Sequence, residues 1–387
     1  MNPCRKSLWI LGALLLLPRF TFAQAWTPTS APSNNWAAVV CSVDGSKIIV
    51  AAGGQFNSGL IYASTNSGLT WVASSAPSNH WISVASSADG SRFLAVAYGG
   101  GLYSSTNFGA DWQSNSVGTH IWYSVASSAD GFRWYAAYFN SLVFGSTNGG
   151  NTWFSNSTAV SDVHTLAASA AGDRLFAGKN TGLTAASTNS GASWVTRTSV
   201  HGNIYSLAGS ADGTRLIAVS AGLSYPYVST STNGGVNWTS NNLPIRSDWY
   251  YSDSSADGTR LAVAGQKGVI YTSTNSGLNW VSNDIPQWLW TSIASSADGS
   301  LLVAVSQNQG VWIRRTTVKP VVKLAFSGGG LKLSWPVTAT NVSVQQSADL
   351  LNWNSAALQP VLNNTNLQNE VILPNTPGNA FYRLTTP

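Results

Sequence analysis

Carboxylates are the side chains from which hydrolysis of a sugar polymer would have to be built, because glycosidases place two of them across the scissile bond. The chain has one glutamate, Glu370, which lies close to its C-terminal end. Most aspartates belong to a recurring hairpin turn, which favours a structural role for them. Three acids outside that turn, Asp162, Asp248 and Asp253, are the candidates for a catalytic acid or base.

Asp253 is the most unusual of the three. When the internal repeats of the chain are aligned, it occupies a strand position at which five other repeats have alanine. These alanines are Ala85, Ala126, Ala167, Ala208 and Ala294. A carboxylate at this position would line a central channel or act in catalysis, unless it is only structural. The alternative function is therefore that of a carbohydrate-active enzyme, a glycoside hydrolase or polysaccharide lyase, which uses one of these acids with a nearby histidine or tyrosine.

Other catalytic chemistry finds less support. A sialidase requires an arginine cluster for the carboxylate of its substrate, but most arginines here recur in register after the hairpin turn. They are Arg92, Arg133, Arg174, Arg215 and Arg260. The serine-rich chain has no Gly-x-Ser-x-Gly nucleophile elbow. The histidines, His80, His120, His164 and His201, lack the paired spacing of zinc ligands. No metal and no cofactor are expected.

A second group of residues is suited to binding. Five repeats place a tryptophan at the start of their inner strand, and the other two have Val163 and Ile204 there. The tryptophans are Trp36, Trp81, Trp122, Trp249 and Trp290. Polar side chains lie just before this position: His80, His120, Arg246 and Asp248. Either the indoles seal the hydrophobic seam between repeats, or they form a ring of aromatic platforms for sugar rings or a partner's side chains.

An internal repeat must position all of these residues. An octapeptide recurs six times, from STNSGLTW at 64–71 to STNSGLNW at 273–280, in steps of 41 to 44 residues. A hairpin turn such as Ala-Asp-Gly-Ser at 88–91 recurs in phase with it. Between these signals each unit has short apolar stretches, which predict the four antiparallel strands of a propeller blade.

The seventh unit indicates how the ring would close. It has the first three strands but neither the octapeptide nor a fourth strand. At the other end of the chain, residues 25–27 precede Pro-Ser-Asn at 32–34 as residues 71–72 precede Pro-Ser-Asn at 77–79. The N-terminal residues are therefore predicted to complete the last blade. We expect an all-β chain with a seven-bladed β-propeller of four-stranded antiparallel blades over 26–316.

The octapeptide itself is predicted to be structural. Its asparagine can bond to the backbone that follows it, and its glycine, such as Gly68, permits the positive φ of a tight turn. Its tryptophan is expected to pack into the core in every copy. These tryptophans are Trp71, Trp112, Trp153, Trp194, Trp238 and Trp280. Because asparagine replaces the usual aspartate, the octapeptide has little charge with which to hold a cation.

The pattern Ser-Thr-Asn-x-Gly-x-x-Trp resembles the Asp-box of bacterial-neuraminidase-type repeats, with asparagine at the acidic position. The resemblance covers roughly residues 26–316 and implies a β-propeller. Such propellers include sialidases, xyloglucan-cleaving glycosidases and sortilin-type receptors. Compact blades with short loops look most like the photosystem II assembly and stability factors, a resemblance that implies binding of partner proteins without catalysis. In this group the boxes lie at the blade periphery, so they identify the fold and not the chemistry.

The two ends of the chain differ from the repeats. Residues 1–25 have a basic start, an apolar run and small residues, which is typical of a cleaved signal peptide and indicates a secreted or periplasmic protein. No later stretch is long and apolar enough to span a membrane. Residues 321–387 have short strand-like segments that predict a small fibronectin- or immunoglobulin-like β-sandwich module. Cys41, the one cysteine beyond the signal peptide, is expected in the core.

Charged residues make up 9% of the chain and the formal net charge is +5, which gives no sign of nucleic-acid binding. The loops between blades are short and leave little room for a pocket that encloses a sugar. We therefore expect an exported, monomeric, non-catalytic propeller. It would bind a protein partner or a polysaccharide at the mouth of the central channel.

Overall fold

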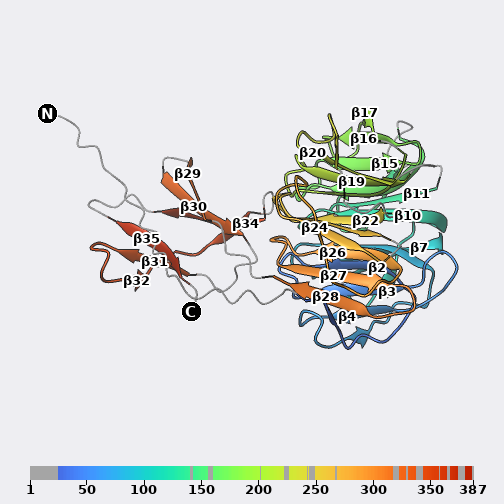
Figure 1. Cartoon of the computed structure of the whole chain (residues 1–387), viewed down its shortest axis with the longest axis horizontal. Helices are drawn as coiled ribbons and strands as arrows, with labels where there is room; N and C mark the ends of the chain where they lie inside the picture. Colours follow the sequence, from blue (N-terminus) through green and yellow to red (C-terminus); the bar gives the residue numbers. More distant parts are fainter. Residues whose placement is uncertain are drawn as a thin grey trace.

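The computed structural model shows a ring of β-sheets with a smaller pair of sheets beside it (Figure 1). It describes residues 25–139, 143–155, 160–200, 202–221, 226–241, 243, 249–265, 268–316, 322–327, 330–336, 343–356, 358–363, 367–373 and 380–385. Residues 1–24 of the predicted signal peptide lie outside these ranges. The elements within them are strands, and no helix there is long and apolar enough to cross a membrane.

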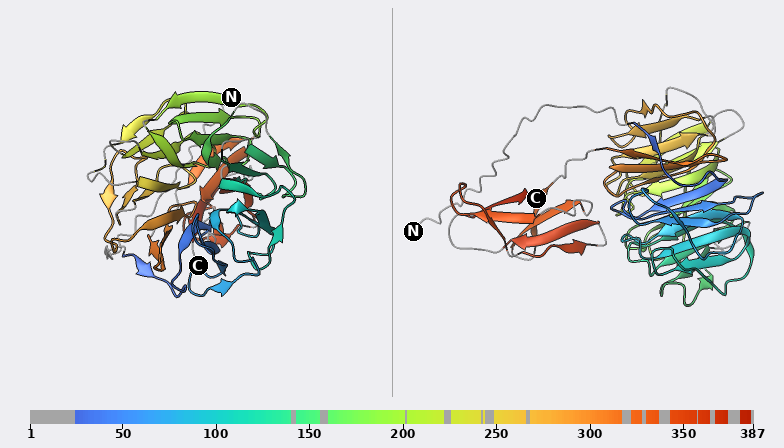
Figure 2. Two further views of the ribbon diagram at one scale, coloured as in Figure 1. Left: turned by 90° about the vertical axis from the view of Figure 1, so that its right-hand side faces the viewer. Right: turned by 90° about the horizontal axis from the view of Figure 1, so that it is seen from below.

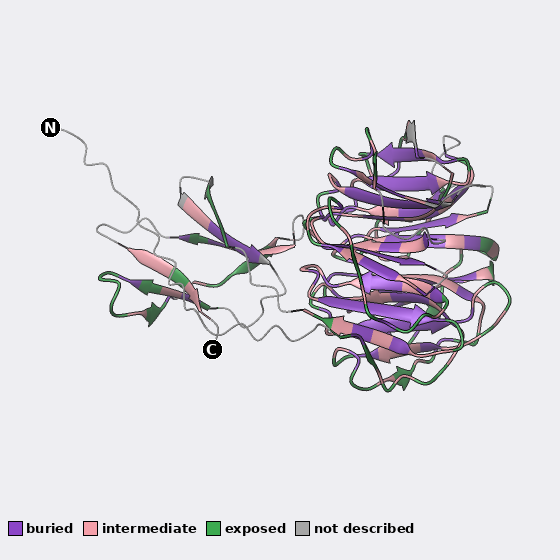
Figure 3. Ribbon diagram, in the orientation of Figure 1, coloured by how far each residue is buried: buried purple, intermediate pink, exposed green. Residues whose placement is uncertain are grey.

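The second blade shows how one repeat folds. Strands β6 (Trp81–Ser86), β7 (Phe93–Gly100), β8 (Leu102–Ser105) and β9 (Gln113–Ser114) pair antiparallel in chain order, from the centre of the ring outward. The first five residues of β7 are all buried because neighbouring blades cover both faces of this strand. Continuous apolar sequence in the middle strands follows from that double burial (Figure 3).

The other blades repeat this order. The first is β2 (Trp36–Cys41), β3 (Ile48–Ala52), β4 (Ile61–Ser64) and β5 (Val72–Ala73). The third is β10 (His120–Ser127), β11 (Trp134–Tyr138), β12 (Val143–Ser146) and β13 (Phe154–Ser155). The fourth is β14 (Val163–Ala168), β15 (Leu175–Lys179), β16 (Leu183–Ser187) and β17 (Val195–Ser199).

The fifth is β18 (Asn203–Gly209), β19 (Leu216–Ala221), β20 (Pro226–Ser231) and β21 (Thr239–Asn241). The sixth is β22 (Trp249–Ser254), β23 (Leu261–Gly265), β24 (Ile270–Ser273) and β25 (Val281–Ser282). The seventh has β26 (Trp290–Ser295), β27 (Leu301–Ser306) and β28 (Val311–Arg315). A short pairing of β7 with β10 joins the second and third blades into one sheet.

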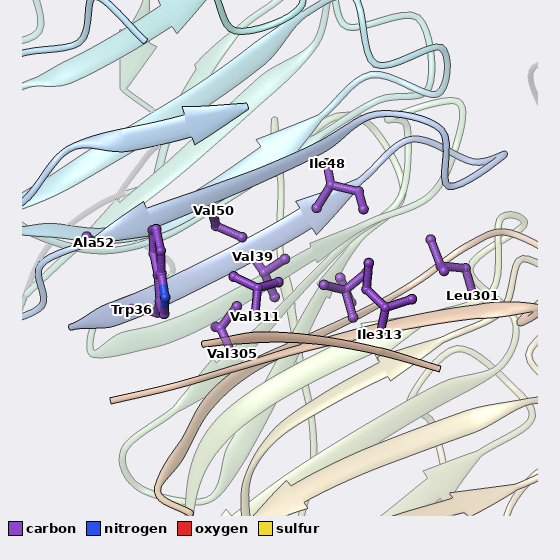
Figure 4. Packing of buried hydrophobic residues seen from close by; sticks show 11 residues of the cluster. Trp36, Val39, Ile48, Val50, Ala52, Leu301, Val305, Val311 and Ile313 are labelled. Carbon is purple, nitrogen blue, oxygen red and sulfur yellow. The ribbon is translucent and has the colours of Figure 1, made fainter. Parts of the chain in front are cut away.

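The N-terminal strand β1 (Thr27–Pro28) supplies the missing outer strand of the seventh blade. Thr27 pairs with Ile313 and Pro28 with Trp312, antiparallel to β28. Behind this junction, the core between the first and seventh blades includes Trp36 and Ile313 (Figure 4). The closure expected from the sequence is thus formed by strand pairing and by burial together.

A circle of backbone hydrogen bonds joins the hairpin turns. The residue in front of the turn in each blade donates its N–H to the equivalent carbonyl of the next blade, at N···O distances of 2.7 to 2.8 Å. In order these residues are Val43, Ala88, Ala129, Ala170, Ala211, Ala256 and Ala297, and Ala297 donates back to Val43. Among the described residues the circle has seven members, which is consistent with seven blades. The left view of Figure 2 shows the ring face-on, with the C-terminal strands behind it.

The octapeptide folds as the sequence predicts, but its tryptophan is less buried than expected. In the first copy, the Ser64 hydroxyl accepts the N–H of Gly68, and the Asn66 side chain accepts the N–H of Thr70. The Trp71 Nε1–H donates to the Gly68 carbonyl. Trp112 is buried, whereas five copies are only half-buried. These are Trp71, Trp153, Trp194, Trp238 and Trp280. Their role is partly to cover the blade edge.

The C-terminal segment forms two small sheets around their own apolar cluster. One sheet contains β29 (Lys323–Ser327), β30 (Gly330–Pro336), β34 (Gln368–Leu373) and β33 (Val361–Asn363). The other contains β32 (Asn354–Ser355), β31 (Ser343–Ser347) and β35 (Phe381–Thr385). Trp335 and Val344 meet between the two sheets. Glu370 forms an ion pair with Lys332 at 3.1 Å.

Candidate functional site

The inner strands β2, β6, β10, β14, β18, β22 and β26 surround the centre of the ring. They all begin on one face, which we call the entry face, and end at the hairpin turns on the opposite turn face. The position called the slot is the inner-strand residue directly before the β-bulge described below. It is occupied by Trp36, Trp81, Trp122, Val163, Ile204, Trp249 and Trp290. Side chains near the slot therefore lie toward the entry face.

The five slot tryptophans are buried and do not form platforms. Trp36, Trp81, Trp122, Trp249 and Trp290 are each at most 2% exposed. Each indole of the first, second and sixth blades lies edge-on to a tyrosine of its own sheet, with ring centroids 5.1 to 5.6 Å apart. A ring enclosed in this way has no free face for a ligand. The stacking hypothesis is therefore wrong at these positions, and burial supports the packing interpretation.

The polar residues beside the slot are also engaged in local structure. The His80 ring bonds to the Gly54 carbonyl at 3.3 Å, and the His120 ring bonds to the Val117 carbonyl at 3.1 Å. His120 also stacks on Tyr138 at a centroid distance of 4.3 Å. The remaining candidates of this group, Arg246 and Asp248, lie outside the described residues, as does His201.

A side chain two positions after the slot links neighbouring blades. Its hydroxyl oxygen accepts a backbone N–H of the next inner strand, at O···N distances of 3.0 to 3.3 Å. The pairs are Ser83 with Val125, Ser124 with Leu166, Thr165 with Leu207, Ser206 with Ser252, and Ser292 with Val39. In the sixth blade this position is occupied by Tyr251, which has no hydroxyl on its Cβ atom.

Asp253 makes the corresponding link from the sixth blade to the seventh. Its Oδ2 accepts the N–H of Ser295 at 2.7 Å, and its Oδ1 accepts the N–H of Ser254 at 2.8 Å. Burial raises the pKa of this carboxyl to about 6, although both hydrogen bonds act to lower it. The carboxylate thus links two neighbouring blades as the hydroxyls do, but two positions closer to the turn face, because it accepts the N–H five positions after the next slot and not the one three positions after it. Its unusual position in the sequence is accounted for by this structural role.

The second described catalytic candidate, Asp162, lies far from Asp253. It precedes the slot of the fourth blade, with φ +61°, and the Ser161 hydroxyl donates to its carboxylate. Along the inner strands, the positions of the two acids differ by five residues, or roughly 16 Å at about 3.3 Å per residue. Glycosidases hold their carboxyl pair about 5 to 9.5 Å apart. In the described ranges no group of three or more His, Cys, Asp or Glu side chains could hold a metal.

A β-bulge follows the slot in every inner strand. In each inner strand, the register of pairing with the second strand of the blade shifts between the slot residue and the second residue after it. The residue between these two is therefore the extra, bulged residue. In the third to sixth blades this bulged residue is aromatic: Tyr123, His164, Tyr205 and Tyr250. In the other three it is Ala37, Ile82 or Thr291. Bulges re-aim side chains in this way at many binding sites.

Together with Tyr98 of β7, these four residues form a continuous row that we call the aromatic arc. The centroid distances along it are 6.3 Å from Tyr98 to Tyr123, 4.8 Å to His164, 5.2 Å to Tyr205 and 4.6 Å to Tyr250. All five side chains are half-buried, so each presents part of its surface. Sequence reasoning missed the arc, although four aromatic residues in consecutive repeats directly after the slot were a visible signal.

The arc is neutral and offers hydroxyl groups among apolar edges. Burial lowers the pKa of His164, so its imidazole is uncharged at neutral pH. Burial and the neighbouring Tyr98 raise the pKa of Tyr123, which keeps that phenol protonated. Beside Tyr123 lie two exposed apolar side chains, Ile121 at 39% and Phe139 at 42%. Such a surface can bind by apolar contact and by hydrogen bonds from phenol groups, and it contains no acid–base pair.

Three solved structures resemble this chain. The structure of YCF48 bound to D1 peptide has a TM-score of 0.58 and 14% sequence identity, and the match covers 81% of this chain and all of that one. YCF48 from Cyanidioschyzon merolae has a TM-score of 0.57 and 12% identity, covering 75% and 98%. The structure of U3-55K has a TM-score of 0.61 and 14% identity, covering 76% and 99%. No family model and no curated protein matches the sequence.

These likenesses and the repeated four-stranded sheets define the chain as a β-propeller. At identities of 12 to 14% they extend to the fold alone. What the propeller binds has to be argued from its own side chains.

Proposed function

We propose that this propeller is a non-catalytic scaffold that binds an extended segment of a protein partner along the aromatic arc. The observation that carries the proposal is the unbroken row from Tyr98 to Tyr250 near the start of the inner strands, on only one side of the ring. Tyrosine contributes much contact area and a hydrogen-bonding group, which is why it is common where proteins meet. On the other side of the ring the bulged residues are Ala37, Ile82 and Thr291, so the row of aromatic rings does not continue there.

The arrangement of the rings favours a protein segment over a sugar. Tyr98 and Tyr123, His164 and Tyr205, and Tyr205 and Tyr250 meet edge to face, at interplanar angles of 61°, 77° and 64°. Neighbouring rings therefore cover much of the flat surface on which a sugar would stack. Aromatic edges and phenol groups of this kind suit the side chains and amide groups of a peptide.

The structural likenesses support this proposal at the level of the fold. One of the similar propellers is described as bound to a D1 peptide, so a propeller of this shape can hold a peptide. We also infer that the repeats are of the Asp-box type. Six copies of the octapeptide and the Ser64, Asn66 and Gly68 hydrogen bonds support that assignment.

A peptide-display selection on the purified chain would test the proposed function. We expect selected peptides to bind the wild type and to lose at least about tenfold in affinity when Tyr123 and Tyr205 are both replaced by alanine. Phe154→Ala provides the matched control, because this aromatic residue is exposed on outer strand β13, far from the channel. Peptides that bind the double variant as well as the wild type would contradict the proposal, as would binding confined to a glycan array.

We further propose that the chain is exported, since residues 1–25 have the composition of a signal peptide. Expression of the full sequence in a bacterial host, followed by fractionation and N-terminal sequencing, tests this point separately. A secreted or periplasmic product that begins near Trp26 is the expected result. An intact N-terminus on cytoplasmic protein would contradict it.

A further inference from the structure

The junction between the sixth and seventh blades is unlike the others on the turn face. In six blades the strand that leads into the octapeptide ends in a buried serine, such as Ser273, which pairs with Leu261. The seventh blade has no octapeptide. At the matching position Leu302 pairs with Arg314, so a guanidinium group lies where the other blades have a small hydroxyl.

A second arginine faces the same junction. The repeated arginine after each turn extends over the turn glycine of the next blade, and in two cases it reaches the octapeptide of that blade. Arg133 donates to Ser190 and Arg215 donates to Ser276. Arg260 lies over Gly299 of the seventh blade in the same way, where there is no octapeptide to receive it. Its guanidinium group instead borders the space beside Arg314.

This space is a cavity of about 50 Å³ lined by both arginines and by hydroxyl side chains. Thr272, Thr274 and Thr316 are among the hydroxyl residues, and Arg314 donates to the Thr272 hydroxyl at 3.3 Å. The described residues that line the cavity include no carboxylate. Since one water needs roughly 10 to 15 Å³ by this measure, the space suits several waters or one small ion.

Two arginine side chains meet at this place. Burial and the neighbouring charge of Arg260 both lower the pKa of Arg314, which shows that the two cations act on each other. The cavity at the preceding junction, between the fifth and sixth blades, offers a comparison. It measures about 10 Å³ and is lined by one arginine, Arg215, which already bonds to Ser276.

We propose that the cavity between Arg260 and Arg314 binds a tetrahedral oxyanion of the size of phosphate or sulfate. Two guanidinium groups present several N–H donors to the oxygens of such an anion, and the threonine hydroxyls can add further hydrogen bonds. The site is on the turn face, at the opposite end of the channel from the aromatic arc. It is therefore independent of peptide binding.

Calorimetric titration of the purified chain with sodium phosphate, at ionic strength held constant with chloride, tests this site. We expect the wild type to bind phosphate, and Arg314→Ser and Arg260→Leu to bind it at least about tenfold more weakly. Arg314→Ser introduces the residue that the sixth blade has at the equivalent position, Ser273. Arg260→Leu introduces the residue that the seventh blade has at the equivalent position, Leu301. Arg215→Leu, which removes the repeated arginine one junction earlier, should bind like the wild type.

The outcomes are distinguishable from a general effect of salt. Equal heats for all four proteins, or no heat from the wild type, would overturn the proposal, and so would tighter binding of acetate than of phosphate. Arg260→Lys and Arg314→Lys keep the charge and provide variants with little risk of misfolding, and each is expected to weaken binding only in part. Thermal unfolding in chloride alone establishes that every variant is folded.

Discussion

The carboxylate of Asp253 in β22 accepts the backbone N–H of Ser295 in β26, at an Oδ2···N distance of 2.7 Å across the junction of two blades. Five other junctions use a serine or threonine hydroxyl for the same purpose. An ionisable group has thus entered a position that is otherwise neutral. Its consequence is a pH dependence that belongs to this one junction.

Stability should fall as the pH rises through the titration of Asp253. The pKa of Asp253 is about 6 in the folded chain and 3.8 without its surroundings, so the folded state keeps a proton that the unfolded state releases. The stabilisation is complete below pH 4 and is lost as the pH passes 6. Asp253→Asn cannot ionise. We expect the difference in unfolding free energy, wild type minus variant, to decrease by about 1 to 2 kcal/mol from pH 4 to 7.

Urea unfolding at half-unit steps of pH measures this difference. Side-chain and backbone hydrogen bonds lower the pKa of four turn aspartates, Asp44, Asp89, Asp212 and Asp257, so their contribution to stability is lost only as the pH falls below about 4. They are present in both proteins and cancel. Parallel curves for wild type and Asp253→Asn between pH 4 and 7 would contradict the assignment.

Two glycines with nearly the same backbone conformation should differ in their tolerance of alanine. Gly131 has φ +66°, and a Cβ there would lie 2.8 Å from Arg92 Cδ and 2.9 Å from Ser87 Cβ. Gly99 has φ +64° with no atom within 4 Å of its Cβ position. Gly99→Ala should therefore cost about 1 kcal/mol from the backbone alone. Gly131→Ala should cost about 1 to 3 kcal/mol more, since blade packing is also disturbed. Equal losses in denaturant unfolding would show that the turn can move away.

Trp81 should matter far more for stability than the octapeptide tryptophan Trp153. Trp81 is fully buried against Tyr103 and Trp112, so Trp81→Ala should cost about 3 to 5 kcal/mol as a large-to-small core change. Trp153 is half-buried at the blade edge, and Trp153→Ala should cost about 1 to 2 kcal/mol. Thermal unfolding ranks the two variants. A Trp81→Ala protein that melts like the wild type would restore Trp81 as a candidate for ligand contact.

Removal of one hydroxyl between blades should be measurable. Ser124 is buried and accepts the N–H of Leu166 at 3.0 Å, so Ser124→Ala leaves a buried N–H without its acceptor. We expect a loss of about 1 to 3 kcal/mol in unfolding free energy. Ser155→Ala, on the exposed strand β13, is the matched control and should change stability by no more than about 0.5 kcal/mol. A loss no larger than that of the control would mean that water satisfies the Leu166 N–H.

Much of the fold could be predicted from the sequence because its signals recur at a fixed spacing. The octapeptides marked the strand ends in six repeats and the Asp-Gly turns in six of seven, and the incomplete seventh unit indicated that an N-terminal strand pairs with it. The outer strand formed by Thr27 and Pro28 confirms that inference. Trp71 and Trp153 are less buried than expected because the octapeptide lies at the edge of a blade, where only one side is covered.

The candidate site was harder to predict, for a local physical reason. Alignment places Trp122 and Tyr123 at adjacent positions of the inner strand, but it does not show which of them faces the channel. The bulge that follows Trp122 decides this, since it leaves Tyr123 as the extra residue. Asp253 was correctly singled out as unusual. Its partner, the Ser295 N–H, belongs to another repeat and had no signal in the sequence.

The pairing of β1 with β28 also imposes an order of events on the chain. The Thr27 hydroxyl bonds to the Ile313 carbonyl, 286 positions away. Strand β1 has no pairing partner until the seventh blade has been synthesised, so the ring cannot close before all the blades exist. Contacts of such long sequence separation slow folding. Until closure, the apolar faces of the end blades are open to other chains, and the rate at which the ends meet sets how long the protein is vulnerable to aggregation.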